Sequence, residues 1–184
     1  MDRLIYTAMS SLKQLDHAKM KYANALTNAS TVGFKQSIQF ATETSQVAGA
    51  GFNTRFVPMN RSNDELVIDQ GPLITTGRKL DIYCKGGTLL GVQGSNGQVA
   101  FTRRGDLLVD QSGFLSTANG HVVLGDGGGP ITVPVGVELA ITNDGTVTAS
   151  DPVQPDAPPT IVGNLLLRDS TGIRIVRRTD GLYE

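Results

Sequence analysis

The first 34 residues constrain the fold most, because a long stretch between Asp2 and Gly33 contains neither glycine nor proline. It is rich in Leu, Met, Ala, Lys and Gln, which are strong helix formers. Asp2 can cap the first turn with its carboxylate. Asn28, Ser30 and Thr31 compete for backbone hydrogen bonds, and Gly33 can take the left-handed conformation that ends a helix. We therefore predict a helix from Asp2 to residues 30–33, about 42 Å long, with a positive φ at Gly33.

Apolar side chains recur along this helix at alternating steps of four and three residues. One line consists of Leu4, Ala8, Ser11, Leu15, Ala18, Tyr22, Ala25 and Ala29, and a second consists of Ile5, Met9, Leu12 and Leu26. A stripe with this period is the seam along which one helix packs on another. The stripe is light in large side chains, so each contact buries little area. We expect it to have partners outside its own domain.

The composition excludes several classes of protein. A net charge of −1 and an isoelectric point near 6.1 give no electrostatic basis for binding nucleic acid or a membrane surface. The single cysteine excludes a disulfide within the chain. No apolar run reaches the length of a membrane span, and the N-terminus lacks the pattern of a cleaved signal peptide. We expect no direct membrane insertion, and either a cytoplasmic protein or export without cleavage.

From residue 71 the hydrophobic period changes from that of a helix to that of a strand. Leu80, Ile82 and Cys84 alternate with polar or exposed types, and turn residues follow about every ten positions, as at 94–97 and 143–145. The segment 151–159 contains four prolines, which indicates a stiff loop. The predicted fold class is α+β, mostly β. It comprises a long N-terminal helix and its end (1–34), an extended arm or linker (35–70) and an antiparallel β domain (71–184).

No catalytic, cofactor or metal site is predicted. The glycines at 125–129 lead into a strand and lack a following Lys-Ser/Thr, so they indicate a turn and not a phosphate loop. The aspartates in turns lack the ligand spacing of a calcium loop. His17 and His121 are the only histidines, and their positions suggest surface roles. Cys84 shares a strand face with Leu80 and Ile82, which indicates a small core side chain.

Several segments resemble the bacterial flagellar rod and hook proteins. Residues 28–34, Asn-Ala-Ser-Thr-Val-Gly-Phe, are similar to a signature near the N-terminus of that family. Residues 77–82, 101–105 and 109–115 resemble further family motifs, and residues 2–10, 125–134 and 180–183 look most like its proximal-rod member. The chain departs from the family at Ala25, where the signature has Asn, and at Thr88, where Trp or Phe is usual. It also stops before the family's second long helix, so we expect a truncated or naturally short member.

The resemblance implies a structural subunit of the flagellar rod, which forms a helical tube that transmits torque and surrounds the export channel. Its partners would be copies of itself, other rod proteins and the type III export apparatus. It would reside in the basal body in the periplasmic space, exported without a cleaved signal peptide. With no second helix to cover the stripe, residues 1–30 should order only on assembly. The expected assembly residues are Leu4, Ile5, Leu12, Leu15, Tyr22, Leu26, Asn28, Gly33, Phe34, Arg78, Arg103 and Arg104.

Two alternatives to this interpretation stay open at this point. The chain could be another member of the rod and hook family. It could instead be a β-domain module that binds a ligand and is carried on a helical stalk. The low aromatic content, 5%, argues against a sugar-binding module. The three arginines are either solvated surface residues or partners for carboxylates on a neighbouring subunit.

Overall fold

The computed structural model describes residues 2–39, 42–45, 48–49, 52–53, 57–60, 64–66, 68, 70–154 and 156–184. The chain divides into two compact units. The first consists of Met1–Thr31 and Lys35–Val67, and the second of Val32–Phe34 and Ile68–Glu184. The last three residues of the N-terminal signature group with the second unit.

The first unit contains helix α1, Asp2–Thr27, of 26 residues. The helix is shorter than predicted, because polar side chains donate hydrogen bonds to carbonyl oxygens in its last turn. The Thr27 hydroxyl donates to Ala23 O at 2.8 Å, and the Asn28 amide donates to Asn24 O at 2.9 Å. The backbone then tightens, with Ala29 N donating to Leu26 O and Thr31 N to Asn28 O. The turn residues that we expected to end the helix at 30–33 therefore end it at Thr27.

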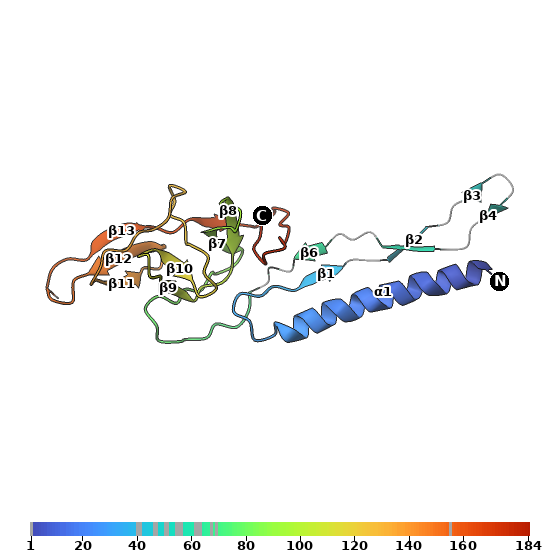
Figure 1. Ribbon diagram of the computed structural model, residues 1–184, viewed down its shortest axis with the longest axis horizontal. Helices are drawn as coiled ribbons and strands as arrows, with labels where there is room; N and C mark the ends of the chain where they lie inside the picture. Colours follow the sequence, from blue (N-terminus) through green and yellow to red (C-terminus); the bar gives the residue numbers. More distant parts are fainter. Residues whose placement is uncertain are drawn as a thin grey trace. The chain divides into compact units, whose positions relative to one another are not determined.

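The rest of the first unit is a set of nested antiparallel strand pairs. They are β1 (Ser37–Gln39) with β6 (Asp64–Leu66), β2 (Thr42–Ser45) with β5 (Val57–Asn60), and β3 (Ala48–Gly49) with β4 (Phe52–Asn53). The labelled strands of these pairs follow one another along a two-stranded ribbon (Figure 1). Helix α1 contacts β5. Most of the described residues in the predicted arm are therefore paired.

The second unit is built from short antiparallel strands. A three-stranded sheet has the order β14 (Leu167–Asp169), β7 (Thr88–Gln93) and β8 (Val99–Thr102). A second has the order β11 (Glu138–Ile141), β12 (Thr146–Ser150) and β13 (Thr160–Asn164). Strands β9 (Leu107–Val109) and β10 (Leu115–Thr117) form a pair. Isolated bridges join these sheets, as between Val92 and Val123 and between Phe101 and Tyr183.

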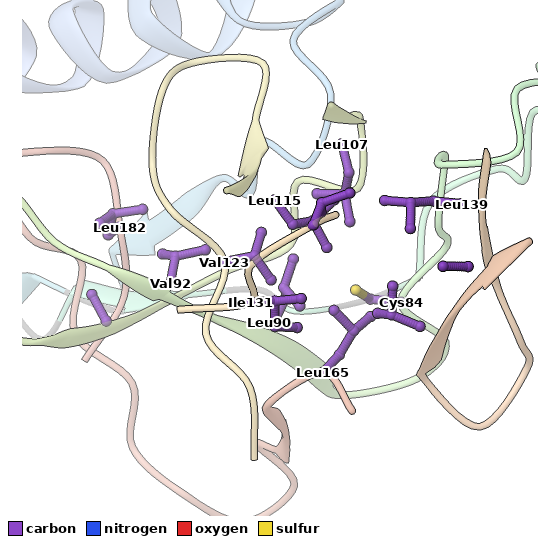
Figure 2. Packing of buried hydrophobic residues seen from close by; sticks show 14 residues of the cluster. Cys84, Leu90, Val92, Leu107, Leu115, Val123, Ile131, Leu139, Leu165 and Leu182 are labelled. Atoms are coloured by element: carbon purple, nitrogen blue, oxygen red, sulfur yellow. The ribbon is translucent and has the colours of Figure 1, made fainter. Parts of the chain in front are cut away.

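The core of the second unit is aliphatic, as the low aromatic content requires. Its fully buried side chains come from every sheet of the unit, and Figure 2 shows them converging on one cluster. They include Leu90, Val92, Leu107, Leu115, Val123, Val147 and Leu182. Cys84 lies in this cluster, which confirms the prediction of a core side chain. Burial raises the pKa of its thiol, and the nearby Arg103 lowers it by a smaller amount.

The predicted fold class needs correction. The described chain is mostly β, but its strands form six small sheets of two or three strands, in place of an extended arm and one antiparallel β domain. Its helix is also shorter than the long element predicted. Strands of two to four residues are too short to show a period-2 pattern, and their pairing depends on residues distant in sequence.

Residues 80–85 also differ from the prediction, since they contain only an isolated bridge between Asp81 and Asp106 in place of a strand. Ile82 N donates to Gly105 O at 2.8 Å. A Cβ on Gly105 would lie 1.9 Å from Ile82 O, so only glycine allows this approach. The predicted turns are confirmed: Gly97 and Gly145 both have positive φ in tight connections, β7 to β8 and β11 to β12.

Candidate assembly surface

Helix α1 carries a row of large apolar side chains that no described part of the chain covers. Among the described side chains, these are Ile5, Met9, Leu12, Leu15, Tyr22 and Leu26, with Tyr22 70% and Leu26 79% exposed. At about 100° per residue they fall within an arc roughly 140° wide. We call this row the outer stripe. The side chain of Leu4, also predicted to belong here, lies outside the described part of the chain.

The opposite face of the helix is partly covered. Its half-buried residues are Gln14, Ala18, Lys21, Ala25 and Asn28, again at steps of four and three. The structure therefore divides the predicted seam. Its small residues Ala18 and Ala25 lie on the half-buried face, while Leu15 and Tyr22 lie on the outer stripe. Small side chains suit the covered face because they permit close approach, and the large ones remain exposed.

The end of the signature lies against the second unit's β structure. Gly33 has φ +73°, which confirms the predicted left-handed conformation. A Cβ there would lie 2.6 Å from Arg104 N and 2.7 Å from Arg103 C, so glycine is required for contact as well as for conformation. The Arg177 guanidinium lies 5.0 Å from the centre of the Phe34 ring, within range of a cation–π interaction. Asn28 accepts from the Thr31 hydroxyl at 3.2 Å and stabilises the helix end.

The three arginines have different environments. Arg103 is only 8% exposed and donates to three carbonyls, those of Ile68 (3.3 Å), Gly86 (2.5 Å) and Cys84 (2.7 Å). Arg104 makes a bidentate pair with Asp106, with both distances 2.7 Å. Arg78 donates to Leu107 O at 2.9 Å and has an Nε–carboxylate distance of 3.5 Å to Asp81, with a largely exposed side chain. Arg103 and Arg104 thus make their hydrogen bonds within the second unit, and Arg78 has the most exposed side chain of the three.

Sequence reasoning missed Arg177 as the residue over Phe34. The contact depends on the hairpin at 176–184, in which Val176 and Glu184 exchange backbone hydrogen bonds and Tyr183 pairs with Phe101. The turn signal Asp180-Gly181 could have indicated this hairpin. No sequence signal indicates that its Arg177 meets Phe34, because the two lie far apart along the chain.

The remaining candidates have ordinary structural roles. Gly125 N donates to Gly129 O at 2.8 Å and Leu124 bridges Pro130, which confirms a turn at 125–129. His17 is exposed and His121 half-buried. Within the described residues, no group of three or more His, Cys, Asp or Glu side chains is placed to hold a metal ion. The described helix is too polar to cross a bilayer.

Comparisons with known proteins identify the class first. The sequence profile described as "Flagellar hook protein FlgE/F/G D1 domain" matches residues 84–149, which is the central part of the second unit. That profile describes structural proteins of the bacterial flagellum. The match therefore favours a flagellar structural protein over a ligand-binding module on a stalk.

Individual relatives narrow the class. The chain is 36% identical to the flagellar basal-body rod protein FlgF of Escherichia coli over 183 residues, all of this chain and 71% of that protein. It is 37% identical to FlgF of Salmonella typhimurium with the same coverage. The rod protein FlgG of Bacillus subtilis is 30% identical over 81% of this chain and 61% of its own length. The chain therefore belongs to the flagellar basal-body rod proteins, resembles the FlgF members most, and is a structural subunit of the basal-body rod.

Proposed function

We propose that this chain joins the rod wall by burying the outer stripe of α1 against helices of neighbouring subunits. The observation that carries the proposal is the exposure of six large apolar side chains on one face of a helix. Burying apolar surface contributes about 25 cal/mol per Å², and the stripe, which the described residues leave exposed, offers this gain to a partner. Scattered apolar residues on a surface need no partner, but a continuous row marks an interaction site.

The neighbours are copies of this chain and other rod proteins. Repeated head-to-tail contacts of this kind do not close, and they generate a helical tube. In such a tube the helices line the axial channel used for export and the β unit forms the outer wall, so that torque passes through the wall. The chain reaches the periplasmic part of the basal body through the type III export apparatus, without a cleaved signal peptide.

The role is mechanical, without catalysis, nucleic-acid binding or membrane insertion. The membership of a structural family supports this proposal, as does the near-neutral net charge. Of the predicted assembly residues, those on the outer stripe are the ones that contact neighbouring subunits in this proposal. Gly33 and Phe34 act by fixing the end of the signature on the second unit.

Leu15→Asp tests the proposal. It places a charge in the middle of the outer stripe, where burial of an unpaired carboxylate is strongly unfavourable. We expect loss of swimming and of this chain from isolated basal bodies, with the β unit still folded by near-ultraviolet circular dichroism. His17→Asp, a change at an exposed residue outside the stripe, should leave swimming intact. Normal swimming with Leu15→Asp would contradict the proposal, as would unfolding of residues 71–184.

A further inference from the structure

The chain enters the second unit twice, at Val32 and again at Ile68. Both entry points meet the same residue. The backbone of Gly33 lies so close to Arg103 that a Cβ on the glycine would be 2.7 Å from the Arg103 carbonyl carbon. The Arg103 guanidinium donates from Nη1 to Ile68 O at 3.3 Å. Two segments that are far apart in the sequence are therefore held at one position in the second unit.

The Arg103 side chain connects this position to the interior of the unit. It is buried, and its other hydrogen bonds go to Gly86 O at 2.5 Å and to Cys84 O at 2.7 Å. Cys84 belongs to the aliphatic core cluster that Figure 2 shows. A planar guanidinium holds several carbonyls at fixed angles, which the flexible ammonium of a lysine does not reproduce. One side chain thus links the second entry point to the core, and its backbone contacts the first.

A second contact fixes the first entry point. The Arg177 guanidinium lies 5.0 Å from the centre of the Phe34 ring. Arg177 forms a bridge with Tyr183, which exchanges backbone hydrogen bonds with Phe101 at 2.8 and 2.9 Å. Phe101 lies in β8, and Arg103 directly follows that strand. Both contacts of the first entry point therefore lead to the same part of the second unit.

Resting on the proposed function, we propose that Arg103 is the tie point through which load on the first unit reaches the β unit. Any load on the residues of the first unit passes into the second through one of the two entry points. Because both are held at Arg103, they share the load and pass it to the core together. In the rod this load is the torque. The two entry points should therefore open together, so that weakening one releases the other.

Trypsin cleavage after Lys35 measures opening of the first entry point, because this half-buried residue directly follows the docked signature. Arg103→Lys removes the guanidinium that holds the second entry point and leaves the backbone beside Gly33 unchanged. In the full chain it should speed cleavage at Lys35 by roughly tenfold, since a local opening then breaks fewer bonds. Arg168→Lys, the same exchange on the exposed strand β14, should leave the rate unchanged. An unchanged rate with Arg103→Lys would overturn the inference.

A loss of global stability also speeds cleavage, and Val147→Ala separates the two causes. Val147 is fully buried on β12, so its truncation destabilises the same core while both entry points keep their contacts. The two variants are compared in urea concentrations that give them equal free energies of unfolding. Cleavage at Lys35 should remain faster with Arg103→Lys. Equal rates would make Arg103 a general stabilising residue and overturn the tie point.

Motility under load tests the tie point in the rod. As the sole copy in a flagellated strain, the Arg103→Lys chain should be present in isolated basal bodies and support swimming in dilute medium. It should lose swimming when a viscous polymer raises the load, whereas Arg168→Lys should swim in both media. Wild-type swimming of Arg103→Lys in the viscous medium would overturn the inference, as would its absence from basal bodies.

These outcomes are distinct from those of the Leu15→Asp test. Normal swimming with Leu15→Asp would remove the outer stripe as the assembly surface, but it would leave the cleavage and viscosity results unchanged. If Leu15→Asp abolishes assembly and Arg103→Lys withstands the load, the outer stripe remains an assembly surface and only the tie point is lost.

Discussion

Gly33 meets two separate structural constraints. Its φ of +73° lies in the left-handed region, which costs other residues roughly 1–2 kcal/mol. Its missing side chain also lets the backbone of Arg103 and Arg104 approach within what would be 2.6–2.8 Å of a Cβ. Phe34 follows at once and lies under Arg177. The last residues of the signature are therefore fixed on the second unit by local backbone geometry and by one aromatic side chain.

Gly33→Val should lower the free energy of unfolding by more than about 2 kcal/mol, because the left-handed strain adds to a backbone clash. Gly172 is the matched control, since its φ is +76° and a Cβ there meets nothing within 4 Å. Gly172→Val should lose only the conformational part. Chemical denaturation of the two variants measures the difference, and equal losses would show that the contact with Arg104 contributes nothing.

Arg103 is a buried side chain that links separate backbone segments of the second unit. Its guanidinium takes the place of a strand partner for the carbonyls of Ile68, Cys84 and Gly86. This explains why the family motif at 101–105 carries an arginine where a surface residue was expected. The same motif places Gly105 against Ile82 O. Both features are structural, and both sit beside the docked signature.

Arg103→Met should destabilise the β unit by roughly 1–3 kcal/mol, because it leaves the buried carbonyl of Cys84 without its donor and an unsatisfied buried group costs about that much. Arg168→Met, on the exposed strand β14, is the control and should change stability little. Urea unfolding followed by circular dichroism gives both values. A loss below 1 kcal/mol for Arg103→Met would place the arginine's donors in solvent and contradict this role.

At the scale of the element, α1 is a helix with two unequal faces. None of its described side chains is fully buried, and its covered face consists of small and polar residues. Isolated helices are marginal in water, and packing of an apolar face supplies most helical stability in proteins. The apolar face here is the one that the described residues leave exposed. The stability of α1 should therefore depend on subunit contacts.

Hydrogen exchange on the purified monomer measures this dependence. Amides of Leu12 to Leu26 should exchange far faster than those of β7 and β8, whose side chains are largely buried. In assembled rods the same helix amides should become protected. Strong protection of α1 in a verified monomer would show that the helix stands without partners, and assembly-coupled ordering would be excluded.

At the scale of the whole molecule, the two units differ in where their apolar side chains lie. The second contains the closed aliphatic core and the segment matched by the flagellar profile. The first presents α1 and its outer stripe on a thin ribbon of short strand pairs. The second unit therefore buries an apolar core within itself, while the first leaves large apolar side chains of α1 exposed.

The sequence by itself determined those features that depend on neighbours in the chain. The absence of glycine and proline through residue 32 predicted the helix, and the glycine at position 33 predicted a positive φ there. Gly97 and Gly145 marked turns, and the signature at 28–34 indicated the family. Each of these signals is local, since it rests on φ preferences or on residues within one or two turns.

Only the tertiary structure decided the features that depend on distant segments. Strands of two to four residues between 37 and 66 carry no readable period, so their pairing into a ribbon followed from contacts across the chain. The burial of Arg103, the meeting of Phe34 with Arg177, and the division of the helix seam into a covered and an open face have the same origin. An exposed arginine and a buried one look alike in sequence, because burial is set by what packs against them.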